Sequence, residues 1–478
     1  MNEKVWRPAP LYVVLGALLT LAMGGCVNQQ KEVAVYRQVL DGDKPLPVHI
    51  EPGAVVTLTD ALRLADQNEE GLNIQGESYL QSLITKDREF ANFLPTLSFS
   101  PSYSVNDTHG SPPGSSNHNY SGSLGAGMNV FNGFRDYYTQ KAADQTIEQQ
   151  RQLLLDAQQT VLLDVITAYY TVLDAEQSVD VLTNSLKVQQ ANVDFIKAQA
   201  AVGTAKPLDI SQSQAQASQT QVSLNQAVAN VHNGRIMLAY LVDAPIENNP
   251  LQDNFDPPTA MAQLEQWEAQ AESGRQDLLA SEAAVRAARN NVDVAFGQYY
   301  PSVTLNFNYF VFKEYNPASA VWNGAISANL PIFTGGVIHA DVRAAWSQFR
   351  QAALTQSQLR RNIDQSVATA YTNLDLAHQQ LAELSIQVTA ARDALYRAQE
   401  LYKNGGGTFL ELLTAQDTLQ TTQLELTNEV FTQKTAYFNL LRSAGQLEMT
   451  VKESAAQSSE TILRNLATQP VTEPTARP

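Results

Sequence analysis

The feature that most constrains the fold is an internal repeat. Val130-Phe131-Asn132-Gly133 corresponds to Ile332-Phe333-Thr334-Gly335, an offset of 202 positions (335 − 133). The same offset relates three further sets: Ala168-Tyr169 and Ala370-Tyr371, Gly203 and Gly405, and Asp209 and Glu411. Because this period is far longer than the unit of a solenoid, it indicates a tandem duplication in which each copy forms half of one fold.

Each copy opens with two stretches of strict alternation. In LPTLSFSPSYSVN, which begins at Leu94, the residues Leu97, Phe99 and Tyr103 alternate with serines. A period of two gives a β-strand one apolar and one polar face. Similar alternation predicts four strands in total, over about 97–105, 119–131, 302–311 and 322–330.

The polar faces of these strands carry Ser, Thr, Asn and Gly, whereas the solvent face of a soluble sandwich would carry Lys and Glu. Each strand has about the 9–11 residues that a tilted transmembrane strand needs. The pattern therefore favours apolar faces against lipid and polar faces lining a water-filled space.

Long helices follow each strand pair. Residues 134–202 and 337–404 contain neither Gly nor Pro, and apolar residues recur every seven positions, as at Val165, Val172 and Val179. Heptads sustained over this length predict coiled-coil helices. Antiparallel partners are expected over 208–241 and 409–441, and a short helix from Thr59. Helices leading into the strands are expected over 72–93 and 261–299, with breaks at Gly71, Gly76 and Gly274.

The N-terminus reads as an export signal. Lys4 and Arg7 precede an apolar run over 11–23, and the ending LAMGGC resembles a bacterial lipobox, which predicts lipidation of Cys26. An unmodified signal peptide with an unrelated cysteine is the alternative. The expected segments are a signal peptide (1–25), an irregular lipid-anchored tether (26–57), two strand–helix repeats (58–248 and 249–450) and a disordered tail (451–478).

Composition excludes several function classes. The chain has 31 Lys+Arg against 48 Asp+Glu, a net charge of −17, which argues against nucleic acid as a partner. Its one cysteine cannot form an internal disulfide, and its six histidines lack metal-ligand spacing. No nucleophile-elbow or phosphate-loop motif occurs. We therefore expect no enzyme activity, no metal and no cofactor.

Strand number constrains the assembly. Four strands cannot close a barrel, eight leave an interior filled with side chains, and twelve leave room for water. The polar faces of the predicted strands favour a barrel of twelve strands. The expected fold is mixed: four transmembrane strands per chain in a homotrimeric 12-stranded barrel, continued by a long antiparallel coiled-coil helical barrel.

The chain resembles the TolC/OprM family of outer-membrane efflux proteins, and its lipoprotein branch in particular. The resemblance rests on TLTDAL, FLPTLS, YYPSVTL, LPIFTGG, LDISQSQAQ and FLELLTAQ, which together span nearly the whole mature chain. It implies a trimer in the outer membrane that extends across the periplasm. It also implies docking to a periplasmic adaptor (membrane fusion protein) and an inner-membrane transporter, for export of drugs or other small toxic solutes.

The resemblance also implies roles for the two helix turns, AVGTAKPLDI and YKNGGGTFLEL. Asp209 and Tyr402 correspond to residues that tie helices together in the closed state, and Glu411 to an acidic ring in which mutual repulsion would raise the carboxyl pKa values. The implied adaptor contacts are Val202, Gly203, Thr204, Gly405 and Gly406.

The second turn departs from the family pattern. Asn404 and Gly405 replace a Val-Gly pair, and Gly407 stands where some members carry arginine. Purely structural roles remain open: the glycines as helix stops, Tyr402 as a packing residue, and Glu411 as part of a T-x-x-E capping box with Thr408.

Two other functions remain open. One is the outer-membrane duct of a type I protein secretion system, which the expected lipid anchor slightly disfavours. The other is a periplasmic coiled-coil adaptor, which has no use for strands that alternate Ser with Phe. The substrate depends mainly on the transporter and is not encoded recognisably in this chain.

Overall fold

A computed structural model describes residues 28–41, 50–51, 53–105, 118–258, 261–313 and 320–447. The expected signal peptide, Cys26 and the expected C-terminal tail lie outside these residues. The chain divides into two compact units, residues 1–45 and 46–478.

The described part of the first unit is one helix, α2 (Gln29–Asp41). We expected this segment to be irregular, and that expectation was wrong. No Gly or Pro interrupts the segment, and the Asn28 side chain accepts a hydrogen bond from the Lys31 N–H at 3.4 Å. These are the local conditions for starting and continuing a helix.

The second unit begins with a short parallel strand pair and a capped helix. Strand β1 (Val56–Thr57) pairs with β4 (Leu251–Gln252), which joins the start of the unit to the start of the second repeat. Helix α3 (Leu58–Asn68) follows at once, because Thr57 and Asp60 form a reciprocal capping box.

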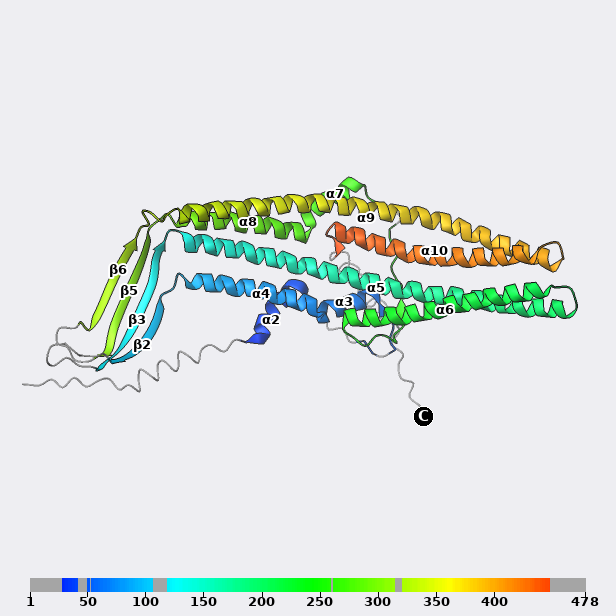
Figure 1. Ribbon diagram of the computed structural model, residues 1–478, viewed down its shortest axis with the longest axis horizontal. Helices are drawn as coiled ribbons and strands as arrows, with labels where there is room; N and C mark the ends of the chain where they lie inside the picture. The colour runs from blue at the N-terminus through cyan, green and yellow to red at the C-terminus, as the bar shows by residue number, and fades with distance from the viewer. Residues whose placement is uncertain are drawn as a thin grey trace, which may run out of the picture. The chain divides into compact units, whose positions relative to one another are not determined.

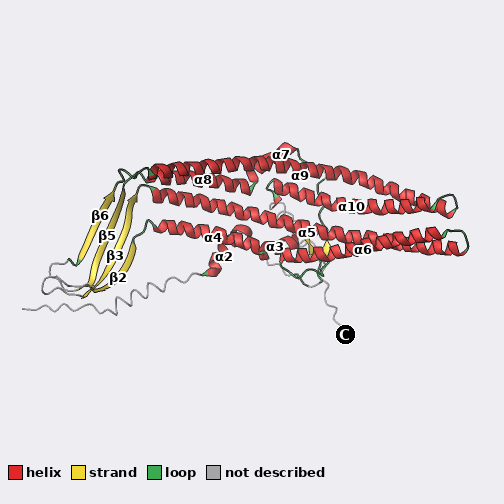
Figure 2. Cartoon of the chain, in the orientation of Figure 1, coloured by secondary structure: helices red, strands yellow, loops and turns green. Residues whose placement is uncertain are grey.

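The four longer strands form one antiparallel sheet at one end of the helices (Figures 1 and 2). Their order in the sheet is β2 (Thr96–Val105), β3 (His118–Asn132), β5 (Ser302–Lys313) and β6 (Trp322–Asn329). The β3–β5 pairing joins the two repeats, so the duplicated hairpins make one continuous sheet.

The register separates the two faces of the sheet. Phe99 lies opposite Leu124, which lies opposite Tyr309, so apolar side chains line up across the strands. On the other face the Asn308 amide donates to Asn323 at 3.2 Å. A Cβ on Gly125 would approach the side-chain oxygens of Ser98 and Asn308 to 3.2 and 3.0 Å, so a small residue is required there.

Two helices of 67 residues each, α5 (Arg135–Ala201) and α9 (Val337–Lys403), run the length of the helical part (Figure 1). At 1.5 Å per residue each is roughly 100 Å long. Both correspond to the stretches without Gly or Pro. The other helices of this unit are α4 (Glu70–Ala91), α6 (Pro207–Val242), α7 (Leu264–Gly274), α8 (Gln276–Gly297) and α10 (Phe409–Ser443).

Of the three expected helix breaks, one is found where it was expected. The chain breaks between α7 and α8 at Gly274–Arg275, as expected. Gly76 lies inside α4 without a break, and the interruption falls at Glu69 instead of Gly71. Glu69 has an extended backbone, and its carboxylate accepts the Leu72 N–H at 2.6 Å, so it ends one helix and caps the next.

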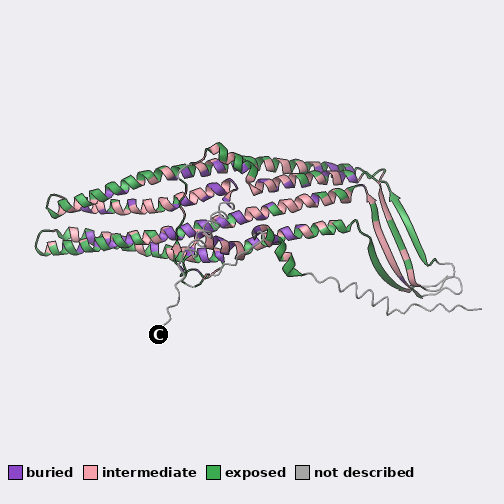
Figure 3. Ribbon diagram, turned by 180° about the vertical axis from the view of Figure 1, so that it is seen from behind, coloured by how far each residue is buried: buried purple, intermediate pink, exposed green. Residues whose placement is uncertain are grey.

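The helices form a curved single layer whose neighbours change along its length. Near the sheet, α5 packs against α4 and α8, and α8 packs against α9. Toward the far end, α5 packs against α6 and α10, and α10 packs against α9 (Figure 1). Buried residues concentrate midway along the helices, whereas the outer strands of the sheet, β2 and β6, are exposed over almost their whole length (Figure 3).

A tyrosine ties the short strands to the helical layer at this middle level. The Tyr169 hydroxyl lies 2.9 Å from the carbonyl oxygens of Val56 and Gln252 and accepts the Gln252 N–H at 3.1 Å. Nearby, the buried Lys434 ammonium donates to Asp253 at 2.6 Å. These bonds hold β1, β4 and the segment after β4 against α5 and α10.

Adjacent tyrosines allow a matched test of this tie. Tyr169→Phe removes a hydroxyl that has three partners, and we expect it to lower stability by about 1–3 kcal/mol because two carbonyls lose a donor. Tyr170→Phe removes a buried hydroxyl that has no partner among the described residues and should cost nothing. The test is to measure the denaturation midpoints of the two variants. Equal decreases in stability would contradict this role for Tyr169.

Candidate functional site

The turns that join α5 to α6 and α9 to α10 lie at the same end of the unit, far from the sheet (Figure 1). Gly203 and Gly405 have φ angles of +78° and +75°, in the left-handed region where glycine is favoured. The Gly203 N–H donates to Ala200 at 3.0 Å, and the Gly405 N–H donates to Tyr402 at 3.2 Å. Both turns are therefore tight reversals at which each helix stops.

Each turn exposes aliphatic side chains beside its glycine. Val202 is 76% exposed, and Gly203, Thr204, Gly405 and Gly406 are exposed as well. Leu208 and Leu410, which follow the turns, are 61% and 65% exposed. The five predicted adaptor-contact residues are thus accessible at one end of the molecule.

Asp209 and Tyr402 do not form the direct bond that we expected. The Asp209 carboxylate accepts the Lys206 N–H at 3.3 Å and so caps α6, which starts at Pro207. The Tyr402 hydroxyl donates to the Gln199 side chain at 3.4 Å. Within tip segments 199–209 and 400–411, the link between the two hairpins therefore runs from Tyr402 to Gln199.

Asp209 still acts on Tyr402 through its charge. Partial burial raises the pKa of Tyr402, and the nearby negative charge of Asp209 raises it further. The Tyr402 ring also lies 6.0 Å from the Phe409 ring, centroid to centroid. Tyr402 thus combines a packing role with a polar link. Nothing in the sequence singled out Gln199, because spacing alone does not say which residue of α5 faces α9.

Glu411 is a helix cap in this structure. Its carboxylate accepts the Thr408 N–H at 2.7 Å, and its own N–H donates to the Thr408 hydroxyl at 3.3 Å. These bonds to the backbone and side chain of Thr408 hold the pKa of Glu411 below its usual range. In the single chain, capping therefore lowers the pKa of Glu411; the raised value expected from repulsion within a ring of three copies stays a prediction.

Gly407 occupies a position with little room for a side chain. A Cβ there would lie 3.0 Å from the Leu401 Cβ and 3.2 Å from the Tyr402 nitrogen. The Gly406 and Gly407 N–H groups both donate to the Leu401 carbonyl, at 2.9 and 3.1 Å. This turn accordingly folds back on the end of α9, where arginine would require the backbone to move.

A polar cluster joins the hairpins further from the tips. The Gln420 side-chain oxygen accepts from Ser185 at 2.6 Å, from Gln189 at 3.1 Å and from Thr220 at 3.2 Å. Helix α10 is thereby bonded to both α5 and α6. This cluster was not predicted from the sequence, since isolated Gln and Thr residues on long helices usually face solvent.

No group of three or more His, Cys, Asp or Glu side chains among the described residues is arranged to hold a metal ion. None of the described helices is long and apolar enough to cross a membrane.

Comparison with known families decides which class of protein this is. Residues 87–242 and 267–446 match the family described as "Outer membrane efflux protein". The chain belongs to this family. The resemblance to outer-membrane efflux proteins is thus confirmed, and so is the expectation that the chain is not an enzyme, since the family consists of transport channels.

Individual members of the family are distant in sequence and close in fold. The outer membrane efflux protein BepC of Brucella suis biovar 1 is 26% identical over 358 residues, which cover 72% of this chain and 76% of BepC. The cation efflux system protein CusC of Escherichia coli K12 is 26% identical over 157 residues, 32% of this chain and 34% of CusC. The crystal structure of the Campylobacter jejuni CmeC outer membrane channel matches with a TM-score of 0.73 at 16% identity, covering 85% of this chain and 93% of CmeC.

The capping role of Glu411 predicts a pH dependence. A carboxyl with a lowered pKa in the folded state stabilises the structure above its unfolded pKa, near 4.5, and loses that contribution as pH falls through the folded value. Hydrogen exchange at the first turn of α10, corrected for the intrinsic pH effect, should therefore accelerate below about pH 4.5.

Glu411→Gln should remove this pH dependence and weaken the turn at neutral pH. A turn whose protection still changes with pH in Glu411→Gln would contradict the assignment. Asp417→Asn, on the same helix but beyond its first turn, is the control.

Proposed function

We propose that three copies of this chain form the outer membrane channel of a tripartite efflux system, which exports drugs or other small toxic solutes. The observation that carries the proposal is the open sheet. Among the described strands, β2 pairs only with β3 and β6 only with β5. Both edges therefore present unpaired N–H and C=O groups, which need a partner in any membrane.

Strand direction supports closure between copies. The described strands alternate in direction along the order β2-β3-β5-β6, so β2 and β6 are antiparallel to each other. A β6 strand next to the β2 strand of a second copy would continue the alternation. Three copies give a closed 12-stranded barrel with apolar faces toward lipid and polar faces toward water.

Exposed apolar side chains on the outermost helices support the same assembly. In the single chain, Tyr240 on α6 is 75% exposed, and Ile386 on α9 is 63% exposed. Helices α6 and α9 are the two ends of the helical layer at its far half. Contact between copies along these helices would bury such residues and close the helical barrel.

The tips are where we propose that the channel meets its partners. Val202, Gly203, Thr204, Gly405 and Gly406 would contact a periplasmic adaptor, which connects the channel to an inner-membrane transporter. The exposed aliphatic residues beside these glycines suit such a contact, because they give apolar anchors on a rigid turn.

The same tips would also form the gate. The Tyr402–Gln199 bond, with Asp209 close by, would hold the hairpins together in the closed state. A threefold axis would bring three Glu411 carboxylates and three Asp209 carboxylates near the pore entrance, where their combined field favours cations. Glu411 would then serve both as helix cap and as part of the ring.

At its other end the channel would be held in the outer membrane by the barrel and by lipid on Cys26. Of the two alternatives from the sequence, the periplasmic adaptor is set aside because the chain belongs to the efflux protein family. A type I secretion duct remains the rival. The name of CusC, a cation efflux system protein, supports small solutes over proteins.

The gate can be tested with two tyrosines on α9. Tyr402→Phe removes the hydroxyl that reaches Gln199, and we expect the channel to open more often in planar bilayers. Tyr396→Phe, six residues earlier and 64% exposed, is the matched control and should behave like the native protein. Equal opening of Tyr402→Phe and the native channel would show that the bond does not contribute to closure.

The assembly and its activity are tested together. We expect the purified chain in mild detergent to have the mass of three copies, and the same preparation to give mostly closed, cation-selective channels in a planar bilayer. A stable monomer, or trimers that never conduct, would overturn the proposal.

A further inference from the structure

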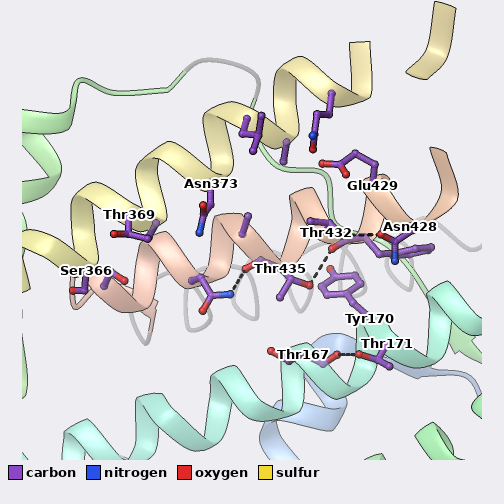
Figure 4. A pocket seen from close by; sticks show the side chains of 18 of the residues that line it. Thr167, Tyr170, Thr171, Ser366, Thr369, Asn373, Asn428, Glu429, Thr432 and Thr435 are labelled. Carbon is purple, nitrogen blue, oxygen red and sulfur yellow. Dashed lines mark hydrogen bonds between the residues drawn. The ribbon is translucent and has the colours of Figure 1, made fainter. Parts of the chain in front are cut away.

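A groove of about 970 Å³ lies between α5, α9 and α10, at the level of the buried middle region (Figure 4). Its lining is rich in small polar residues, among them Thr167, Thr369, Asn373 and Thr435. The volume matches that of sites for drug-sized molecules, roughly 300–1,000 Å³.

The groove opens on the opposite side of the helical layer from β1 and β4. On α5, Tyr169 faces those strands, whereas Thr167 and Thr171, two positions before and after it, line the groove. On α10, Lys434 bonds to the segment after β4, whereas Thr435 lines the groove. In the trimer proposed above, this free face of the layer would be the lumen wall.

The charged residues that line the groove are both acidic. Asp174 and Glu429 belong to the lining, and no Lys, Arg or His does. Asp174 accepts one hydrogen bond, from Asn428 at 3.3 Å, while its Oδ1 and the Glu429 Oε1 are buried without a hydrogen-bond partner among the described residues. Burial raises the pKa of both carboxyls, and at Asp174 the hydrogen bond from Asn428 offsets this effect only in part.

A third unpartnered group points to a ligand independently of these carboxylates. Tyr170 is 1% exposed, lines the groove, and has no hydrogen-bond partner for its hydroxyl among the described residues. It projects from α5 toward α10 (Figure 4). Its ring stacks near those of Phe431 and Phe438, at centroid distances of 6.1 and 6.2 Å. Buried polar groups normally have partners, so three exceptions around one groove need an explanation.

We propose that this groove binds hydrophobic organic cations, such as protonated amines or quaternary ammonium compounds. The carboxylates supply the opposite charge, Leu376, Ala377 and Phe431 of the lining supply apolar surface, and its hydroxyls and amides accommodate varied polar groups. An inorganic metal ion fits less well, because no group of three or more His, Cys, Asp or Glu side chains among the described residues could hold one. The inference rests on the proposed function, since it names a class of solute that the channel would carry.

The test is a fluorescence titration of the full-length protein with ethidium, an aromatic monocation. Asp174→Asn combined with Glu429→Gln should weaken ethidium binding at least tenfold. The matched control is Asp180→Asn combined with Asp375→Asn, which removes the same charge from exposed positions outside the groove on α5 and α9 and should leave binding unchanged. Equal weakening by the two double variants, or none, would overturn the proposal.

A second variant distinguishes loss of a ligand contact from misfolding. Tyr170→Phe keeps the ring and removes only the unpartnered hydroxyl, so it should fold normally and weaken ethidium binding two- to fivefold. Unchanged binding would contradict a ligand contact at this hydroxyl. An anionic dye of similar size, anilinonaphthalene sulfonate, should bind no more weakly to the Asp174/Glu429 double variant than to the native protein; a parallel loss would mean that the variant is damaged generally and would count against the site.

Conductance in planar bilayers separates the two claims. A native channel that conducts but does not bind ethidium refutes the groove and leaves the proposed function standing. A native protein that binds ethidium as predicted but never conducts refutes the proposed function and leaves the groove as a binding site.

Discussion

The open edges of the four-stranded sheet are the constraint on which the rest of the structure depends. A strand edge in hydrocarbon leaves backbone N–H and C=O groups without partners, at a cost of several kcal/mol for each group. Both β2 and β6 have such an edge, and neither can be satisfied within one described sheet. The two faces of the sheet also differ in polarity, with aromatic residues on one face and serines, asparagines and glycines on the other. In the proposed trimer, neighbouring copies would satisfy these edges.

The helices continue the layer away from the sheet. Because α5 and α9 run without a break for 67 residues, a single layer of helices continues from the sheet to the tips. What holds the layer together changes along that length. Near the middle, the aromatic core around Tyr169 and Tyr170 packs against the short strands and α3. Toward the tips, polar contacts to Gln420 and between Tyr402 and Gln199 take over. Polar contacts of this kind can exchange with water, which suits the opening that we propose for this end of the channel.

How much the sequence predicts depends on the range of the interaction. Strands, long helices and glycine turns were predictable because alternation, heptads and left-handed glycines act within a few residues. The family was predictable because several short sequence motifs, among them TLTDAL and FLELLTAQ, together resemble those of the family. Helix α2 was not predicted because the prolines that follow it led us to treat the whole segment as irregular. The residues of the helix itself contain no Gly or Pro.

Contacts between distant segments were harder to predict. Asp209 and Glu411 occupy equivalent places in the two repeats, and the structure uses both first as helix caps. The partner of Tyr402 and the groove around Asp174 depend on how each helix is rotated about its axis, which depends on the packing of the whole layer. Sequence spacing does not report that rotation.

The central claim is that β6 of one copy pairs with β2 of the next, and disulfide formation between copies tests it most directly. Ser327→Cys in β6 would be combined in turn with Ser98→Cys, Ser100→Cys or Ser102→Cys in β2, since cysteines bridge only when their Cα atoms lie within about 7 Å. The account predicts that at least one pair yields covalent dimers and trimers in the membrane on oxidation, while the single-cysteine variants do not. Folded protein in which no pair cross-links between copies would contradict it.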